Sequence, residues 1–99
     1  MIGSFREDWV REIADGLKTA KARKNLPQEL HSKAKLKIEL IHLAGHPNDL
    51  RVPPGNRFES LKGKRSDEYS IRINDQWRIV FRYDDKMNVF YDVMIEDYH

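Results

Sequence analysis

The sequence predicts a small α+β domain in which two N-terminal helices pack on an antiparallel sheet of three to five strands. Three observations indicate this fold. The chain has 99 residues, the length of one domain, and 39% of them are hydrophobic, enough to bury a modest core. Apolar residues recur at helical spacing in the first half, and they alternate with polar residues in the second half. We therefore expect residues 1–99 to form a single domain.

The N-terminal region is predicted to contain a short edge strand at residues 2–5 and then an amphipathic helix over residues 7–18. The helix is indicated by apolar side chains at helical spacing, namely Trp9, Val10, Ile13 and Leu17. Residues 19–25 are polar and basic, and we expect them to form a linker or a frayed extension of this helix.

A second helix is predicted from Pro27 to about residue 44. Proline suits the first turn of a helix, and Gly45 followed by Pro47 ends it. One apolar stripe is formed by Leu30, Ala34, Ile38 and Ile41. A wider arc, which adds Leu36, Leu40 and Leu43, indicates contact with both the first helix and the sheet.

Beyond a turn-rich connector at residues 51–56, the apolar pattern changes to a period of two. Three strands are predicted, with the alternating apolar sets Tyr69–Ile71–Ile73, Trp77–Ile79–Phe81 and Val89–Tyr91–Val93–Ile95. Residues 74–76 and 84–88 have the composition of hairpin loops. The pattern predicts a meander of three or four antiparallel strands.

Charge is unevenly distributed along the chain, although the formal net charge is only +2. Residues 18–37 contain seven basic residues and one acid, Glu29, so this segment carries a net charge of +6. A basic segment on a nearly neutral domain indicates either a polyanionic partner or a solvated lysine-rich helix face. Charge alone does not decide between them.

The residue types also exclude several classes of site. Without cysteine there is no disulfide and no thiolate metal site, which fits a reducing compartment. The histidines at positions 31, 42 and 46 lack the spacing and third ligand of a zinc site, so no metal or other cofactor is expected. Neither a signal peptide nor a membrane-spanning run is visible, so we expect a cytoplasmic protein with no membrane association.

The predicted hairpin places cations on one face of the sheet. With a loop at residues 74–76, Arg72 lies directly opposite Arg78, which is unfavourable unless something compensates the like charges. Arg82 lies further along the same face, and cations before the hairpin can reach it, namely Lys62, Lys64 and Arg65. Several cations with few acids favour a phosphate-binding face. Alternatively, the arginines extend into solvent or pair with Glu59, Asp67 and Glu68.

The chain ends Asp97-Tyr98-His99 directly after the last predicted strand. The imidazole of His99 titrates near neutral pH and can transfer a proton in RNA cleavage. Tyr98 can stack on a base or orient a phosphate. The alternative for a terminal histidine is a disordered chain end.

Three strings in the second half of the chain form a recognisable pattern. Residues 49–63 read DLRVPPGNRFESLKG, residues 69–81 read YSIRINDQWRIVF, and the chain ends DYH. In order and spacing these strings resemble the HigB-type killer proteins of plasmid maintenance systems, which belong to the RelE superfamily of toxins. The N-terminal half is similar to the family only in its pattern of elements.

The resemblance implies a RelE-like fold and a toxin that cleaves mRNA in the ribosomal A site without a metal ion. It also implies a helix-turn-helix antitoxin of the HigA type as partner. Active-site positions of the family fall on Lys62, Arg78, Asp97, Tyr98 and His99. Glu59 stands where some members carry a histidine, and Lys64 where many carry an acid. RNA contacts are expected at Glu59, Lys64, Arg65, Arg72 and Arg82.

In the reaction that the resemblance implies, a 2′-hydroxyl attacks the adjacent phosphorus, which requires a base, an acid and cations. We expect His99 to transfer a proton, and Arg78 and Lys62 to hold the phosphate. Asp97 would orient its neighbours, and Tyr98 would stack or donate a hydrogen bond. The alternative function is a non-catalytic RNA- or ribosome-binding module of the same fold, which would not need the complete DYH end.

Overall fold

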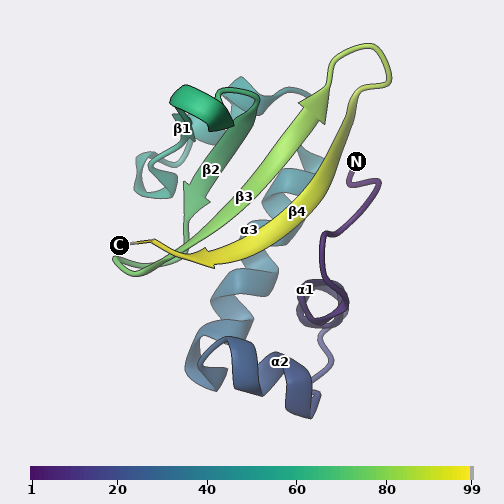
Figure 1. Ribbon diagram of the computed structural model, residues 1–99, viewed down its shortest axis with the longest axis vertical. Helices are drawn as coiled ribbons and strands as arrows, with labels where there is room; N and C mark the ends of the chain where they lie inside the picture. The colour runs from purple at the N-terminus through teal and green to yellow at the C-terminus, as the bar shows by residue number, and fades with distance from the viewer. Residues whose placement is uncertain (99) are drawn as a thin grey trace.

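Four antiparallel strands form a sheet in the order β1-β2-β3-β4, and the helices lie against one of its faces (Figure 1). The computed structural model describes residues 1–98. Its helices are α1 (Asp8–Ala14), α2 (Ala20–Asn25) and α3 (His31–Leu43), and its strands are β1 (Glu59–Ser60), β2 (Glu68–Arg72), β3 (Trp77–Asp84) and β4 (Val89–Asp97). Short 3₁₀ turns occupy Gln28–Leu30, Pro47–Arg51, Pro54–Asn56 and Gly63–Arg65. The predicted α+β fold is confirmed.

The N-terminal helices differ from the sequence prediction in number and length. The first helix ends at Ala14, because Gly16 adopts a left-handed conformation with φ 77° two residues later. The predicted linker at residues 19–25 instead contains helix α2, whose first turn is capped by the Thr19 hydroxyl accepting from the Ala22 amide. The described residues therefore contain three α-helices, and the expectation of two was wrong.

The core lies between the helices and one face of the sheet. Helices α1 and α3 contribute Val10, Ile13, Ala34, Ile38 and Ile41, and the sheet contributes Ile71, Ile79, Phe81, Val93 and Ile95. Burying each large aliphatic side chain contributes about 1.5–3 kcal/mol to stability. The predicted contacts of α3 with the first helix and with the sheet are both present. Leu36 and Leu43 are largely exposed, however, and take no part in them.

A β-bulge changes which side chains of β4 face the core. Val80 pairs with Met94, but Arg82 pairs with Tyr91, so β4 contains one extra residue at this point. The bulge includes Asp92, which has φ 52°. Because the alternation shifts there, Phe90 is fully buried beside Phe81, whereas the sequence pattern had assigned Tyr91 to that face.

The N-terminal segment covers the free edge of β4. Ile2 and Phe5 form isolated parallel bridges with Phe90 and Val93. The segment is thus at a sheet edge, as predicted, although it forms no continuous strand. At the other end of the sheet, the end of β4 lies beside the β2–β3 hairpin, where Asp97 pairs with Trp77 (Figure 1).

The outer face of the sheet is the one turned away from the helices, and it carries Glu68, Ser70, Arg72, Arg78, Arg82 and Glu96. Ser70 and Val80 are fully buried on this face, because residues 57–65 fold across it. This segment and the end of β4 together position the candidate site.

Candidate functional site

Arg78 lies at the centre of the candidate site and is only 6% exposed. Its Nε donates to Ser70 Oγ at 2.9 Å, and its Nη2 donates to the Arg57 carbonyl oxygen at 2.6 Å. Nη2 also lies 3.2 Å from a carboxylate oxygen of Glu59. Within residues 1–98, Nη1 makes no hydrogen bond. The guanidinium is therefore fixed along the edge that Nε and Nη2 form.

The neighbours of Arg78 on the sheet follow from the predicted register. Arg72 lies directly opposite Arg78, as the three-residue loop required, and Ser70 is the diagonal neighbour on the same face. Burial lowers the pKa of Arg78, the carboxylate of Glu59 opposes this effect, and the guanidinium of Arg72 adds to it. Glu59 thus compensates part of the repulsion between two arginines on adjacent strands.

Tyr98 covers the guanidinium of Arg78. The Arg78 Cζ atom lies 5.1 Å from the centre of the Tyr98 ring, within the range of a cation–π contact. Tyr98 is 42% exposed, so part of the residue remains accessible to a partner. Its backbone amide donates to the Gln76 carbonyl oxygen, and the Gln76 side chain donates to Asp97 Oδ2 at 3.1 Å. The end of β4 is therefore attached to the hairpin loop and is not a frayed tail as far as Tyr98.

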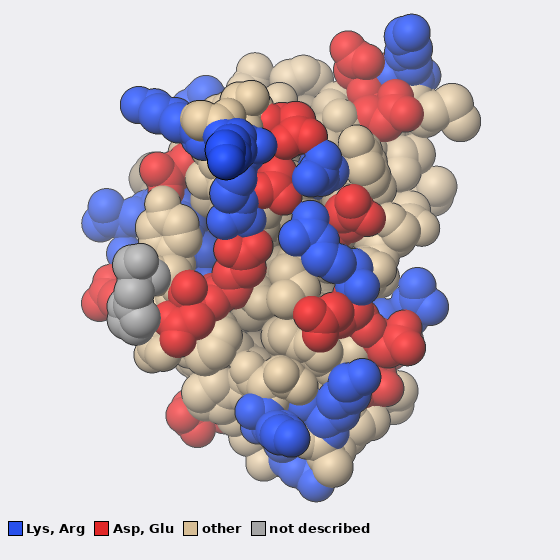
Figure 2. All heavy atoms as spheres, viewed as in Figure 1, with Lys and Arg blue, Asp and Glu red and all other residues tan. Residues whose placement is uncertain are grey.

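The other arginines of the outer face are paired with acids. Arg65 binds Glu68 and Glu96, Arg72 binds Asp75, and Arg82 binds Asp67 with longer contacts to Glu68 and Asp92. Blue and red side chains accordingly alternate over the sheet in Figure 2. The expected cation-rich, acid-poor face is absent from the described residues, and the alternative of arginine–carboxylate pairing describes it better.

Glu68 is the most buried acid of this network, at 3% exposure. Burial raises its pKa, but hydrogen bonds from Arg65 and Arg6 outweigh that effect, and the pKa lies below its ordinary value. The hydrogen bond to Glu96 in turn raises the pKa of Arg65. These contacts fix residues 63–65 against β2 and β4.

The remaining predicted site residues lie around this cluster. Lys62 and Lys64 are exposed on the segment that crosses the outer face, and within residues 1–98 their ammonium groups make no hydrogen bond or ion pair. Arg82 lies four residues further along β3 than Arg78, outside the cluster. His99 lies outside the described residues.

Two members of the cluster were missed by sequence reasoning. Ser70 accepts from Arg78, and its diagonal position across the hairpin was a signal that could have identified it. The Arg57 carbonyl also accepts from Arg78, but no sequence pattern indicates which backbone carbonyl a distant guanidinium will contact.

The basic segment lies at the other end of the molecule. Its lysines and arginines are mostly exposed on α2 and the first turns of α3, and blue side chains gather over α2 in Figure 2. Lys37 differs, because it is half-buried and donates to the side chain of Asn56; burial and the nearby Lys33 lower its pKa. This surface is separate from the cluster around Arg78.

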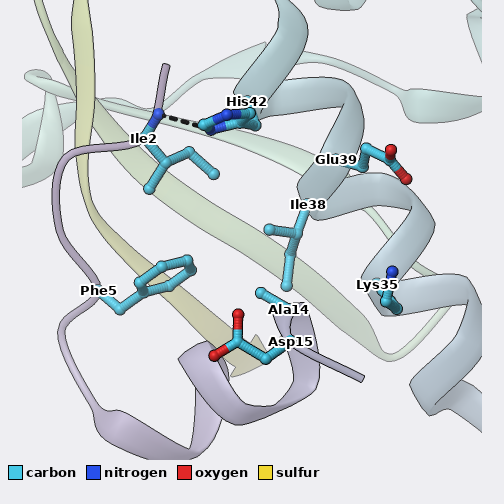
Figure 3. Close-up of a pocket in the computed structure, with 8 residues that line it drawn as sticks. All are labelled: Ile2, Phe5, Ala14, Asp15, Lys35, Ile38, Glu39 and His42. Atoms are coloured by element: carbon cyan, nitrogen blue, oxygen red, sulfur yellow. Dashed lines mark hydrogen bonds between the residues drawn. The ribbon is translucent and has the colours of Figure 1, made fainter. Parts of the chain in front are cut away.

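A pocket of about 320 Å³ opens between the N-terminal segment, α1 and α3 (Figure 3). Ile2, Phe5 and Ile38 line it, and the Ile2 amide donates to His42 Nδ1 across its rim at 3.1 Å. Among the described lining residues, none is a predicted site residue. Within residues 1–98, no group of three or more histidines and acids is arranged to hold a metal ion. No helix there is long and apolar enough to cross a membrane.

Comparisons with known proteins agree with the fold and with the sequence strings. Residues 3–99 match the family described as the RelE-like toxin of the type II toxin–antitoxin system HigB. Toxin HigB-1 of Vibrio cholerae is 32% identical over 90 residues, which cover 89% of this chain and 92% of that protein. An uncharacterized protein of Haemophilus influenzae is 31% identical over 80 residues, covering 81% of this chain and 76% of that protein.

Among solved structures, the YoeB–YefM complex from Staphylococcus aureus contains a chain with a similar fold. Its TM-score is 0.59 at 20% identity, and the match covers 100% of this chain and 98% of that chain. At this level of identity the likeness concerns the fold alone.

Proposed function

The chain belongs to the HigB family of RelE-like toxins of type II toxin–antitoxin systems, and from this premise we propose that it is an endoribonuclease that cleaves mRNA in the ribosomal A site and so inhibits translation. The observation that carries the proposal is the cluster that Arg78, Glu59 and Tyr98 form at the end of β4. It combines a buried cation, whose Nη1 makes no hydrogen bond within residues 1–98, with an exposed aromatic residue. The proposed site of action is cytoplasmic.

The proposed reaction is attack of a 2′-hydroxyl on the adjacent phosphorus. The 2′-oxygen loses its proton and bonds to phosphorus, and the bond from phosphorus to the 5′-oxygen breaks. The leaving 5′-oxygen takes up a proton, which gives a 2′,3′-cyclic phosphate and a 5′-hydroxyl. Negative charge increases on the non-bridging oxygens in the transition state, so a fixed cation there lowers the barrier.

Arg78 is the cation best suited to that role. Its Nε and Nη2 are held by Ser70, Arg57 and Glu59, so Nη1 can donate to a phosphate oxygen with little loss of side-chain entropy. Lys62, which is exposed on the segment that crosses the outer face of the sheet, would add a second cation. Tyr98 would stack on a base or donate its hydroxyl, since its ring is already oriented by Arg78.

Proton transfer is assigned to His99, with Asp97 orienting the end of the chain. Glu59 is held in an ion pair with Arg78, so proton transfer is not assigned to it. The assignment uses side chains alone and requires no metal ion.

A helix-turn-helix antitoxin of the HigA type is the proposed partner that neutralises the toxin. The proposal is supported by membership of a toxin–antitoxin family. It is tested by inducing the chain alone and then together with its neighbouring reading frame. We expect growth arrest in the first case and normal growth in the second.

The test of the activity itself is to map mRNA ends after induction, with Arg82→Ala as the matched control for a variant at Arg78. Cuts that disappear with Arg78→Ala and persist with Arg82→Ala support the enzyme. Growth arrest without any cut mRNA would favour the non-catalytic binding module.

A further inference from the structure

Arg57 adopts a backbone conformation that is unusual for its side chain. Its φ and ψ are 45° and 52°, in the left-handed region where glycine is favoured and other L-residues are disfavoured. Its amide closes the 3₁₀ turn Pro54–Asn56 by donating to the Pro54 carbonyl at 3.0 Å. Such strained residues persist where the surroundings fix them, and they are often found at functional sites.

The neighbouring Asn56 fixes this turn. Its side chain is fully buried, and Nδ2 donates to the carbonyls of Leu50 and Val52 at 3.1 and 3.4 Å. Its Oδ1 accepts a hydrogen bond from Lys37 on α3. The turn that precedes Arg57 is thus bound to the preceding segment through Leu50 and Val52 and to α3 through Lys37. These contacts fix the position of Arg57.

The backbone of Arg57 is also bound to the candidate site. Its carbonyl oxygen accepts from Arg78 Nη2 at 2.6 Å. One residue therefore supplies the acceptor that orients Arg78 and carries a second guanidinium, whose charge acts on Arg78.

Arg57 is exposed, and no acid among residues 1–98 pairs with its guanidinium. The chain has nine arginines, and eight of them contact an acid, a carbonyl, an amide or an aromatic ring: Arg6, Arg11, Arg23, Arg51, Arg65, Arg72, Arg78 and Arg82. Within the part of the chain that the structure describes, the Arg57 side chain makes none of these contacts. Its positive charge contributes to lowering the pKa of Arg78, after the larger effect of burial.

We propose that Arg57 is a further substrate-binding residue that contacts an RNA phosphate adjacent to the one held by Arg78. This inference rests on the proposed function and extends it by a second phosphate contact at the same site. An exposed arginine without an internal partner can bind a phosphate with two parallel hydrogen bonds and breaks no ion pair in doing so. By contrast, Arg65, Arg72 and Arg82 would first have to separate from their acids.

The test uses binding of a short 2′-O-methylated single-stranded RNA, which lacks the attacking hydroxyl and cannot be cut. Arg57→Gly removes the guanidinium but tolerates the left-handed backbone and keeps the carbonyl that orients Arg78. Arg57→Lys keeps the charge. Arg11→Ala removes one positive charge from α1, which packs on the opposite face of the sheet, and is the matched control.

We expect Arg57→Gly to melt at or above the temperature of the wild type and to bind the RNA more weakly. The logarithm of its association constant for the RNA, plotted against the logarithm of salt concentration, should fall with a slope that is less steep by about 0.7. This is the value for one phosphate contact of a single strand. Arg57→Lys and Arg11→Ala should keep the wild-type slope.

Three results would overturn the inference. The first is a salt dependence of RNA binding in Arg57→Gly that equals that of the wild type, and the second is an equal loss of RNA affinity in Arg11→Ala. The third is no binding of this RNA by the wild type at low salt. The RNA cannot be cut, so the binding test does not depend on cleavage. If Arg57 contributes to binding but the chain cleaves no mRNA on ribosomes, the proposed function is contradicted and the phosphate contact of Arg57 is not.

Discussion

Replacement of Arg78 by lysine tests whether the candidate site needs a guanidinium or only a positive charge. Lysine keeps the charge and much of the length, but its ammonium cannot contact Ser70 Oγ, the Arg57 carbonyl and Glu59 from one plane while donating to a phosphate. Arg78→Lys therefore removes the fixed donor geometry and leaves the net charge unchanged.

The expected magnitudes follow from the contacts that are lost. Loss of one donor that stabilises transition-state charge typically lowers the rate by about 10²–10³, or about 2.7–4 kcal/mol of barrier. Hydrogen bonds to charged groups each contribute about 1.5–3 kcal/mol to stability, and the ammonium can replace one of the two that Arg78 makes. We therefore expect a loss of about 1.5–3 kcal/mol in the free energy of unfolding.

The assay is single-turnover cleavage of mRNA on saturating ribosomes, at a temperature where thermal melting shows the variant to be folded. Arg82→Lys is the control, because Arg82 is also paired with acids but lies outside the cluster. A wild-type cleavage rate in folded Arg78→Lys would refute the role assigned to the guanidinium.

The Glu68 network, the chain terminus and the metal requirement each provide a further test. The pKa of Glu68 is lowered in the folded chain, so its contribution to stability is present above the unfolded-state pKa and is lost as the pH falls through the folded-state value. Urea unfolding of Glu68→Gln should therefore show lower stability at neutral pH and a weaker decline in acid, and a decline as steep as in the wild type would contradict this. Deletion of His99 should reduce cleavage by about 10²–10⁴ with little change in melting temperature, and wild-type cutting would remove it from the mechanism. Cleavage should persist in EDTA when ribosome integrity is controlled for, and a loss that a transition metal restores would contradict the metal-free reaction.

The sequence predicted the elements with strong periodicity and missed those that depend on single residues. Helix α3 and the β2–β3 hairpin repeat their apolar side chains regularly, so their position and register could be inferred. The end of α1 depends on the left-handed Gly16, and α2 depends on the cap formed by Thr19. Both signals are local and weaker than periodicity, which explains why the number of helices was underestimated.

The β-bulge at Asp92 shows a different limit. A period of two assigns side chains correctly only while the strand contains no extra residue, and Asp92 inserts one. From that point Phe90 and Tyr91 exchange faces relative to the sequence pattern. No feature of the local sequence predicts this change of face.

The candidate site was predictable where it depended on register and unpredictable where it depended on tertiary contacts. The position of Arg72 opposite Arg78 follows from the loop length, and the structure confirms it. The pairing of Arg65 with Glu96 joins residues 31 positions apart, and such a contact cannot be read from spacing. Because such ion pairs could not be predicted, we expected more unpaired positive charge on the outer face than the structure shows.

The most direct measurement of the central claim is the chemistry of the mRNA ends produced on stalled ribosomes. The wild-type chain, added to ribosomes that hold a defined codon in the A site, should cut within that codon. The upstream fragment should carry a 2′,3′-cyclic phosphate and the downstream fragment a 5′-hydroxyl, and neither should appear with Arg78→Lys or with the His99 deletion at the same reaction time. Intact A-site mRNA in the presence of folded, ribosome-bound protein, or 5′-phosphate ends on the downstream fragment, would contradict the account.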